Sequence, residues 1–470
     1  MKKIMVFTVA VILIIACFAG CDNKTGGNKA TLRTSIDPGE YTFPDLPASG
    51  TYDFGGETIT VVSYHGQEFE QRNDFIRRYA QDLQIEDRFN VKIAYSTDID
   101  KHVADAIAGD PTADIAYLMN HQMTQYIKSG ALEPMQGYAE QLKLGNNDRY
   151  DQELIDWCTV NGNIYGIGVK PEELWKYHYV NAMFMNINLL EERGIKADEI
   201  YAAQENKEWT WEKFKDTAKA VTSDLNGDGI PDVYGTTVGG MGLLESLMVS
   251  NGTNFVKQEE DGKFIFDVDS KGITVLNYMR DLVTDGAART TEGNGGYPYT
   301  QDQADFVAGK IGFQIMVFQR TWVEGGLLDM KYKYGVLSIP IGPDADDYYY
   351  TDSLYALYAM FAQPDKENAK KIAEFIYIYT TSLYESDEDE KEAYWDEANN
   401  RIFDEGSEYF LERVYEQTNV VRINNNMFTH WGLGGLFNIE PVIGGVKTAQ
   451  QVVEEVTAPC QDFIDKLFVA

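Results

Sequence analysis

Three short apolar runs decide the fold, and they read TITVVS (58–63), NVKIAY (90–95) and ADIAYL (113–118). Each run is rich in β-branched or aromatic residues and contains no Gly or Pro, as is typical of a β-strand. The two intervening segments carry apolar residues at mostly helical spacing, and the second ends at Gly109-Asp110-Pro111. Strands that alternate with helices predict an α/β domain with a parallel sheet.

In such sheets, ligands bind beyond the carboxyl ends of the strands. Tyr64 and His65 follow the first run, and Asn120, His121 and Gln122 follow the third, so both loops are candidate binding loops. His65, Asn120 and His121 are the ligand-binding candidates among them. The alternative is that they are ordinary solvated loop residues.

A second set of strands and helices begins near Lys170. Strands are predicted at 179–186, 312–318, 334–339 and 353–361, and helices at 189–193, 273–283, 368–379 and 448–467. Residues 385–400 are strongly acidic and predict a solvated surface helix. The full length of 470 residues suits two or three domains, each with its own core.

The composition is that of a globular but strongly acidic protein. Hydrophobic residues make up 44% and charged residues 24%, and the formal net charge is −34. A field of this sign repels phosphates, which argues against a nucleic-acid partner, and it disfavours an anionic ligand. The 30 Tyr residues are typical of polar-tipped rings at a binding surface, although many of them will lie in a core.

The N-terminus carries an export signal. Lys2 and Lys3 precede an apolar run at 4–19, which ends in Ala19-Gly20-Cys21. The box resembles that of bacterial lipoproteins, in which the Cys after small residues is lipidated, although Phe18 stands where these proteins usually have Leu. Residues 1–20 are therefore predicted as a signal peptide, Cys21 as the lipidated residue and 21–50 as a flexible tether. The alternative is a plain signal peptide or a short membrane anchor.

Few cysteines remain for other roles. Cys17 lies in the signal peptide and Cys21 carries the predicted lipid, which leaves Cys158 and Cys460. Two distant cysteines make no disulfide framework, and no Cys/His spacing indicates a structural zinc.

The segment SDLNGDGIPDVYG (223–235) resembles an EF-hand calcium loop at the first five of its six ligand positions. The ligands would be Asp224, Asn226, Asp228, the carbonyl of Ile230 and Asp232. The twelfth position is Gly235 instead of a bidentate Glu, so calcium would need a ligand from elsewhere or more water. The alternative is a turn whose Asp and Asn side chains hydrogen-bond its own backbone.

A family resemblance rests on short motifs in a fixed order. They are NIYGIG (163–168), MNINLL (185–190), EWTWEKF (208–214), DGIPDVYG (228–235), FVAGKIG (306–312) followed by Trp322, YGVLSIP (334–340) and NAKKIAEF (368–375). Together they resemble family 1 extracellular solute-binding proteins, the lipoprotein receptors of ABC importers, typically for sugars and oligosaccharides. Gly312-Phe313 and the acidic insert after Thr381 depart from the family pattern.

The resemblance implies a periplasmic-binding-protein-like fold. Two α/β lobes would be joined by crossing hinge strands, with the ligand in a cleft between them and closure by hinge motion. Lobe 1 is expected to comprise 51–170 and 350–395, and lobe 2 to comprise 171–349 and 396–470.

The resemblance also suggests ligand-binding residues. Sugar binding uses flat aromatic faces and planar polar groups. Trp322 and Trp431 stand at stacking positions, Tyr177 precedes the inter-lobe strand, and Met241 lies in a loop expected to face the cleft. For each of them the alternative is a core or loop residue without contact to a ligand.

The expected function is that of a monomeric, lipid-anchored receptor on the extracellular face of the bacterial cytoplasmic membrane. It would capture a sugar or oligosaccharide and deliver it to the permease subunits of an ABC importer. No cofactor is required, and calcium would be structural. The chain shows no GxSxG, HExxH or phosphate-loop motif, so it is not expected to be an enzyme. The alternatives are a secreted glycoside hydrolase, which needs a carboxylate pair, a receptor for a non-sugar solute, and a calcium-dependent adhesin.

Overall fold

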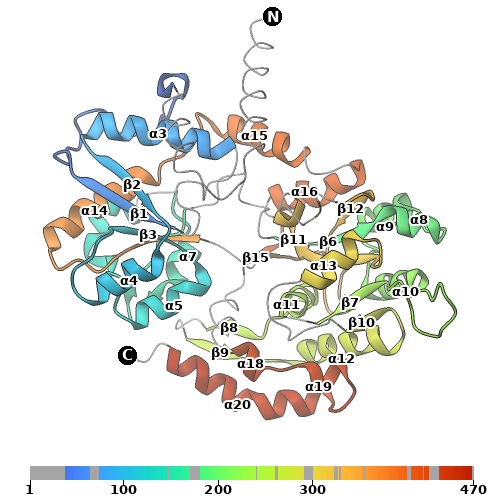
Figure 1. Cartoon of the computed structure of the whole chain (residues 1–470). Coiled ribbons are helices and arrows are strands. Elements are labelled where there is room, and N and C mark those ends of the chain that lie inside the picture. The colour runs from blue at the N-terminus through green and yellow to red at the C-terminus, as the bar shows by residue number, and fades with distance from the viewer. Residues whose placement is uncertain are drawn as a thin grey trace, which may run out of the picture.

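The chain folds into two lobes, each built around its own hydrophobic core (Figure 1). The structure is a computed structural model. It describes residues 37–63, 73–145, 149–169, 180–239, 241–259, 263–290, 300–321, 327, 330–352, 356–399, 404–416, 418–422 and 433–467.

The first lobe contains a four-stranded sheet in the order β14-β3-β1-β2. Its strands are β1 (Thr58–Val62), β2 (Lys92–Ser96), β3 (Ile115–Met119) and β14 (Ala356–Met360). β1 is parallel to β2 and β3, which confirms the predicted parallel arrangement, and β14 joins β3 in the antiparallel direction. β1 alternates between Thr and buried apolar residues over 58–61, and at its end both faces are buried, with Val61 in one cluster and Val62 in the other.

Helices cover both faces of this sheet. α3 (Asn73–Phe89) and α14 (Lys366–Tyr379) pack on one face, and α4 (Ile99–Ile107), α5 (Asn120–Lys128) and α7 (Gln152–Trp157) pack on the other. Asp98 caps α4, because its Oδ1 accepts the backbone N–H of Lys101 at 3.2 Å. The remaining helices of this lobe are short, with η3 (Met135–Tyr138) leading into α6 (Ala139–Leu142).

The N-terminal arm, residues 37–50, packs against the first lobe and is not a free tether over this part. It contains the short helix η1 (Pro38–Glu40), and Phe43 and Leu46 are only 2% and 6% exposed. Gln84 of α3 donates its side-chain amide to the carbonyls of Pro38 and Tyr41 at 2.8 and 2.9 Å. The predicted tether of 21–50 therefore has to be corrected, since the folded body already includes residues 37–50.

The second lobe is centred on an antiparallel sheet in the order β11-β6-β12. Its strands are β6 (Asn181–Asn186), β11 (Phe313–Val317) and β12 (Tyr334–Leu337), and the surrounding strands are β7 (Thr236–Val238), β10 (Ala288–Thr290), β8 (Val256–Gln258) and β9 (Phe264–Phe266). Its helices include α8 (Ile187–Glu192), α9 (Ala197–Glu205), α10 (Trp211–Val221), α11 (Met241–Ser250), α12 (Ser270–Thr284), α13 (Thr300–Val307), α16 (Glu408–Tyr415), α18 (Gly434–Leu436), α19 (Glu440–Ile443) and α20 (Ala449–Leu467).

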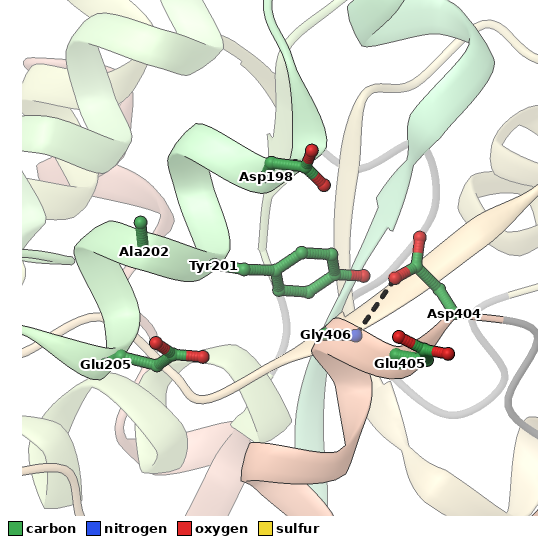
Figure 2. Close-up of a pocket in the computed structure, with 7 residues that line it drawn as sticks. All are labelled: Asp198, Tyr201, Ala202, Glu205, Asp404, Glu405 and Gly406. Atoms are coloured by element: carbon green, nitrogen blue, oxygen red, sulfur yellow. Dashed lines mark hydrogen bonds between the residues drawn. The ribbon is translucent and has the colours of Figure 1, made fainter.

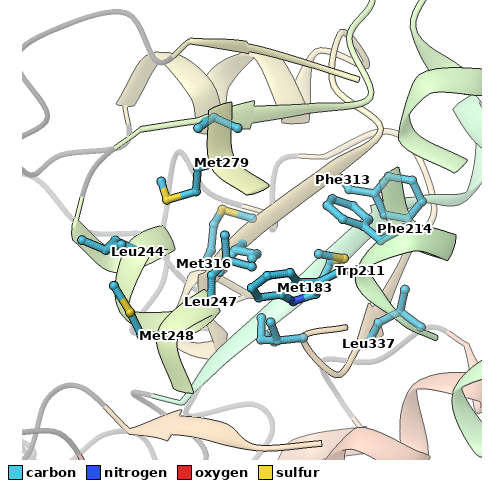
Figure 3. Packing of buried hydrophobic residues seen from close by; sticks show 14 of the residues in the cluster. Met183, Trp211, Phe214, Leu244, Leu247, Met248, Met279, Phe313, Met316 and Leu337 are labelled. Carbon is cyan, nitrogen blue, oxygen red and sulfur yellow. The ribbon is translucent and has the colours of Figure 1, made fainter. Parts of the chain in front are cut away.

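The core of the second lobe is rich in aromatic and methionine side chains (Figure 3). Phe313 of β11 is fully buried, and its ring lies 5.5 Å from that of Phe214 and 5.8 Å from that of Trp209. Trp211 stacks on Tyr278 at 4.3 Å and donates its indole N–H to the hydroxyl of Ser250. These contacts tie α10, α11 and α12 to the central sheet.

Two segments that were assigned to the first lobe pack in the core of the second. β13 (Tyr350–Asp352) pairs with β15 (Val420–Arg422), and Tyr350 is fully buried against Phe410 of α16. The acidic stretch forms the predicted helix, α15 (Asp387–Asn399), but Tyr394 on it is fully buried. The prediction of a solvated helix is wrong for this face, because Tyr394 and Ala398 are buried in the second core and Trp395 packs against it.

The part of the chain that the structure describes contains no helix long and apolar enough to cross a membrane. Cys158 and Cys460 are both buried and unpaired. Burial raises the pKa of each thiol to about 12, so neither is a reactive thiolate at neutral pH.

Replacing Phe313 with Ala is expected to destabilise the second lobe strongly. The substitution removes a fully buried ring that contacts two other aromatic rings, which costs about 3–5 kcal/mol. Urea denaturation followed by tryptophan fluorescence measures the loss. Val446→Ala, at a side chain that is 79% exposed, is the matched control and should leave the midpoint nearly unchanged. Equal midpoints for both variants would show that Phe313 does not hold the core together.

Candidate functional site

The two sheets come close together where the chain passes between them. Asp352 at the end of β13 bridges Val180, next to the start of β6, and Ala356 at the start of β14 pairs with Met119, the last residue of β3. Only residues 353–355 separate Asp352 from Ala356, and this length of chain spans at most about 14 Å. The carboxyl end of β3 and the amino end of β6 are therefore neighbours, and we call them the facing ends of the two sheets.

The facing end of the first lobe carries two of the predicted binding residues. Asn120 and His121 begin α5 directly after β3, as the strand-end rule predicts. Asn120 is fully buried, and its Oδ1 accepts the backbone N–H of His121 at 3.0 Å. Its side chain thus orders the start of α5, whereas His121 is only half-buried. Their contact with a ligand stays a prediction.

Gln122 lies next to them and has an unsatisfied amide. Its Oε1 accepts the backbone N–H of Met119 at 2.9 Å, but its Nε2 has no hydrogen-bond partner in the described part of the chain, although the residue is only 2% exposed. The hydroxyl of Thr124, two residues further, also has no hydrogen-bond partner in the described structure. A buried donor without an acceptor costs about 1–3 kcal/mol, so these groups can gain free energy from a hydroxyl-bearing solute or from water.

In the second lobe, hydrogen bonds hold the first turns of α11 at the facing end. Asn181, the first residue of β6, donates its side-chain amide to the hydroxyl of Ser246 at 3.0 Å. Ser246 in turn donates to the carbonyl of Gly242 at 2.8 Å. Because Asn181 pairs with Val317 at the end of β11, the start of α11 is level with the ends of both strands. Met241 is the first residue of this helix, and its side chain lies outside the described part of the structure.

Glu245 is the unexpected polar residue in this helix. It is 3% exposed, and its Oε1 has no hydrogen-bond partner among the described residues. Burial raises the pKa of its carboxyl to about 8, so the group is mostly protonated at neutral pH. It adjoins Ser246 and therefore lies near the level of Asn181. No sequence pattern selects Glu245, because it stands in an otherwise apolar run, GLLESLMV (242–249).

The remaining predicted residues lie outside the described part of the chain. They are His65, Tyr177, Trp322, Trp431 and the lipidation site Cys21. In the sequence, His65 lies two residues after Ser63, Tyr177 lies three residues before Val180, and Trp322 directly follows Thr321. Their roles in ligand binding and lipidation stay predictions.

The calcium-like loop closes on itself through hydrogen bonds. Asp224 accepts the backbone N–H groups of Gly227 and Gly229 at 2.7 and 2.8 Å, which lower the pKa of its carboxyl. Asp232 accepts those of Leu225 and Asn226. These hydrogen bonds are the ones expected for the alternative to a calcium loop, a turn whose Asp and Asn side chains bond to its own backbone. Within the described residues no group of three His, Cys, Asp or Glu side chains is placed to hold a metal ion.

The loop also lies away from the facing ends. It connects α10 to β7, and its own ends are bridged between Ser223 and Val233. β7 runs from this loop toward Met241, so the loop is at the opposite end of the strand from the start of α11. Calcium binding through Asp224, Asn226, Asp228, Ile230 and Asp232 stays a prediction, and it would concern the stability of the second lobe.

A separate cavity of about 480 Å³ lies between α9 and the short helix η7 (Glu405–Ser407) (Figure 2). Four carboxylates surround it, from Asp198, Glu205, Asp404 and Glu405, and Tyr201 lies between them. Asp404 accepts the backbone N–H of Gly406 at 3.0 Å. None of these elements adjoins the facing ends, so the cavity is not the expected solute site, and its charge disfavours anions.

One family model matches the sequence. It describes a bacterial extracellular solute-binding protein, and it matches residues 74–382, about two thirds of the chain. No curated protein matches the sequence.

Solved structures with a similar fold include sugar-binding proteins. An ABC substrate-binding protein from Listeria monocytogenes in complex with cycloalternan has a TM-score of 0.55 at 17% identity, over 87% of this chain and 98% of its own. The cyclic α-maltosyl-1,6-maltose binding protein from Arthrobacter globiformis has a TM-score of 0.59 at 16% identity, over 87% and 99%. UgpB from Mycobacterium tuberculosis, in complex with glycerophosphocholine, has a TM-score of 0.57 at 14% identity, over 88% and 99%. These likenesses confirm the predicted periplasmic-binding-protein-like fold.

Glu245→Gln is expected to flatten the dependence of stability on pH. The raised pKa means that the folded state holds a proton that the unfolded state releases, so the free energy of unfolding falls as the pH rises from about 4.5 to about 8. The variant has no titrating carboxyl at this position. Its free energy of unfolding relative to that of the parent should therefore rise by roughly 3 kcal/mol between pH 5 and pH 8. Chemical denaturation at both pH values measures the difference. Glu212→Gln, at an exposed glutamate of α10, is the matched control, and parallel pH profiles for parent and Glu245→Gln would contradict the burial of this carboxyl.

Asp224→Ala is expected to lower the thermal midpoint even in the presence of a chelator, because backbone N–H groups of the loop lose their acceptor. A second arm adds calcium to the parent protein. The sequence prediction of a calcium loop requires a rise in midpoint that Asp228→Ala abolishes. An unchanged midpoint with calcium would leave only the hydrogen-bonded turn.

Proposed function

The chain belongs to the bacterial extracellular solute-binding proteins, and we propose that it is the receptor of an ABC importer for a sugar or oligosaccharide. The observation that carries this proposal is the pair of facing ends, where each lobe has a buried side chain with one polar atom that has no hydrogen-bond partner in the described structure. These are Gln122 in the first lobe and Glu245 in the second. A solute bound between the lobes would satisfy both, and closure of the lobes would be favoured by that gain.

The chemistry of the two groups fits hydroxyl-rich solutes. The amide nitrogen of Gln122 is a donor, and the protonated carboxyl of Glu245 both donates and accepts. A sugar hydroxyl matches either group because it is a donor and an acceptor at once. The net charge of −34 adds a long-range term against anionic solutes. Trp322, Trp431 and Tyr177 would supply the aromatic faces for the sugar rings, and His65, Asn120, His121 and Met241 further contacts.

The cellular setting follows from the predicted signal. The lipid on Cys21 would hold the receptor at the extracellular face of the cytoplasmic membrane, and the permease and its ATPase would supply the energy for import. The chain between Cys21 and residue 37 would be the free part of the tether, because the arm at 37–50 packs on the first lobe. We propose a monomer that needs no cofactor for this role, and no catalytic residue is assigned.

A receptor for a non-sugar solute is the second candidate. One structure of similar fold holds glycerophosphocholine. That solute also carries hydroxyl groups, so the unsatisfied amide and acid do not by themselves separate it from a sugar. A solute screen therefore has to include polyols and phosphodiesters beside carbohydrates.

A thermal-shift screen of the form that lacks residues 1–21 tests the proposal. A solute that binds the folded form raises the midpoint by mass action, and we expect a rise with one class of mono- or oligosaccharide. Gln122→Ala should weaken that binding by roughly tenfold, the equivalent of one lost hydrogen bond. Trp322→Ala should weaken it further through the loss of stacking.

Two controls make the screen specific. Gln152→Ala, on the exposed side of α7, removes a glutamine away from the facing ends, and Tyr332→Ala removes an exposed aromatic ring. Neither should change the shift. If no carbohydrate changes the midpoint but a phosphodiester or polyol raises it, the proposal of a sugar ligand is wrong and the proposal of a solute receptor stands.

A further inference from the structure

The acidic insert after Thr381 is the third segment by which the chain passes between the lobes. α14 belongs to the core of the first lobe and α16 to the core of the second, and α15 lies between them (Figure 1). We call residues 380–399 the strap. The packing of its two ends differs from that of an ordinary surface loop.

At its first end the strap is fixed to α3 by buried polar contacts. Gln81 donates its side-chain amide to the carbonyl of Ser382 at 2.9 Å and to that of Thr381 at 3.3 Å. Arg78 donates to the carbonyl of Tyr379 at 2.8 Å, and its guanidinium lies 4.3 Å from the centre of the Tyr379 ring. Arg78 and Gln81 are 2% and 0% exposed, so water does not compete for these bonds.

Arg77 adds a contact that joins three separate parts of the first lobe. Its guanidinium lies 4.5 Å from the ring centre of Tyr384 in the strap and 5.7 Å from that of Tyr41 in the N-terminal arm. Leu383 and Tyr384 are buried, and they form a small cluster of their own with Ala393 of α15. One cation on α3 thus holds the arm on one side and the strap on the other.

At its second end the strap is fixed to the core of the second lobe. Tyr394 is fully buried and donates its hydroxyl to the carbonyl of Leu411 at 2.9 Å. Its ring lies 4.9 Å from that of Tyr415, and Trp395 lies 6.0 Å from the same ring. The acidic residues of the first turn, 387–390, favour the helical state of the segment through the helix dipole.

We propose that the strap restrains the motion of the two lobes, and that the contact of Arg77 with Tyr384 is its release point. A hinge motion changes the separation of groups that lie in different lobes, so a segment anchored in both must bend or give up one anchor. The second anchor is a fully buried, hydrogen-bonded ring. The contact at Arg77 is the weaker one, because this side chain is only partly buried and meets the carbonyl of Leu383 at 3.5 Å.

The consequence concerns the equilibrium between lobe arrangements. Loss of the contact at Arg77 would leave Ser382 bonded to Gln81 but would free the chain between Ser382 and Tyr394, and the lobes could then sample a wider range of separations. This inference rests on the proposed receptor function in one respect, which is that the motion of the lobes serves to capture a solute. The motion itself can be measured without any solute. A negative result in the sugar screen would therefore not count against the strap, and a negative result for the strap would not count against the sugar.

Pulsed electron paramagnetic resonance on the ligand-free chain lacking residues 1–21 tests the strap. Spin labels on Asp100→Cys in α4 and Lys219→Cys in α10 report the separation of the lobes, and both positions are exposed. Cys158 and Cys460 are fully buried, so they do not take up label. We expect a narrow distance distribution for this parent, and a distribution at least twice as broad, or with a second maximum, for Arg77→Ala and Tyr384→Ala.

The controls separate the strap from general loosening. Arg88→Ala removes a cation from the same helix, whose guanidinium donates to the side chain of Gln84 and not to the strap in the described structure, and it should keep the narrow distribution. Arg77→Lys keeps the charge and should restore most of the narrow distribution. Because Arg77 is partly exposed, its Ala variant is expected to fold, which thermal unfolding confirms. A distribution for folded Arg77→Ala that superimposes on that of the parent would overturn the proposal.

Discussion

The short connection between β13 and β14 is the constraint on which the arrangement of the molecule depends. Tyr350 of β13 is buried in the second core against Phe410, while β14 is paired along its whole length with β3 of the first sheet. Both flanking strands are thus fixed in different lobes, and only residues 353–355 lie between them. A connection this short brings the end of β3 close to the start of β6, whatever the separation of the outer parts of the lobes. The polar side chains described above therefore stand on elements whose ends this connection brings together.

Burial has opposite effects at the facing ends and in the cores. In the second core, rings such as Phe313 and Trp209 gain from complete exclusion of water. At the facing ends the same exclusion leaves Gln122 and Glu245 with unsatisfied polar atoms, which is unfavourable for the ligand-free protein. A solute that forms hydrogen bonds with these atoms removes this unfavourable free energy, which adds to the free energy of binding. The raised pKa of Glu245 has the same origin, because no charged group in the described structure offsets its desolvation.

The sequence predicts most of the elements but not all of their packing. Local apolar patterns predict several elements, because residues that face one core recur at the spacing of a strand or a helix. These elements are the strands at 58–62, 115–119 and 313–317 and the helix at 366–379. Phe43 and Leu46 were missed, since they lie among Pro and Asp residues without any period. Tyr394 was missed because acidic residues dominate its helix. Glu245 could not be found at all, because an unpaired acid in an apolar helix is visible only once burial is known. The aromatic candidates Trp322 and Trp431 rest on the family resemblance alone.

The N-terminal arm and the strap are both attached to α3 of the first lobe. The arm packs on α3 through Gln84, Phe43 and Leu46, so with Cys21 lipidated as proposed the lipid is connected to the first lobe. The strap is anchored to the same helix through Gln81, Arg78 and Arg77. A force on such a tether would therefore act on α3, and it would reach the second lobe through the crossing segments, through α15 and through the contact of Lys128 in α5 with the carbonyl of Lys466 in α20. If Cys21 is lipidated as proposed, the first lobe is the one to which the tether attaches, and the second lobe is connected to the membrane only by way of the first.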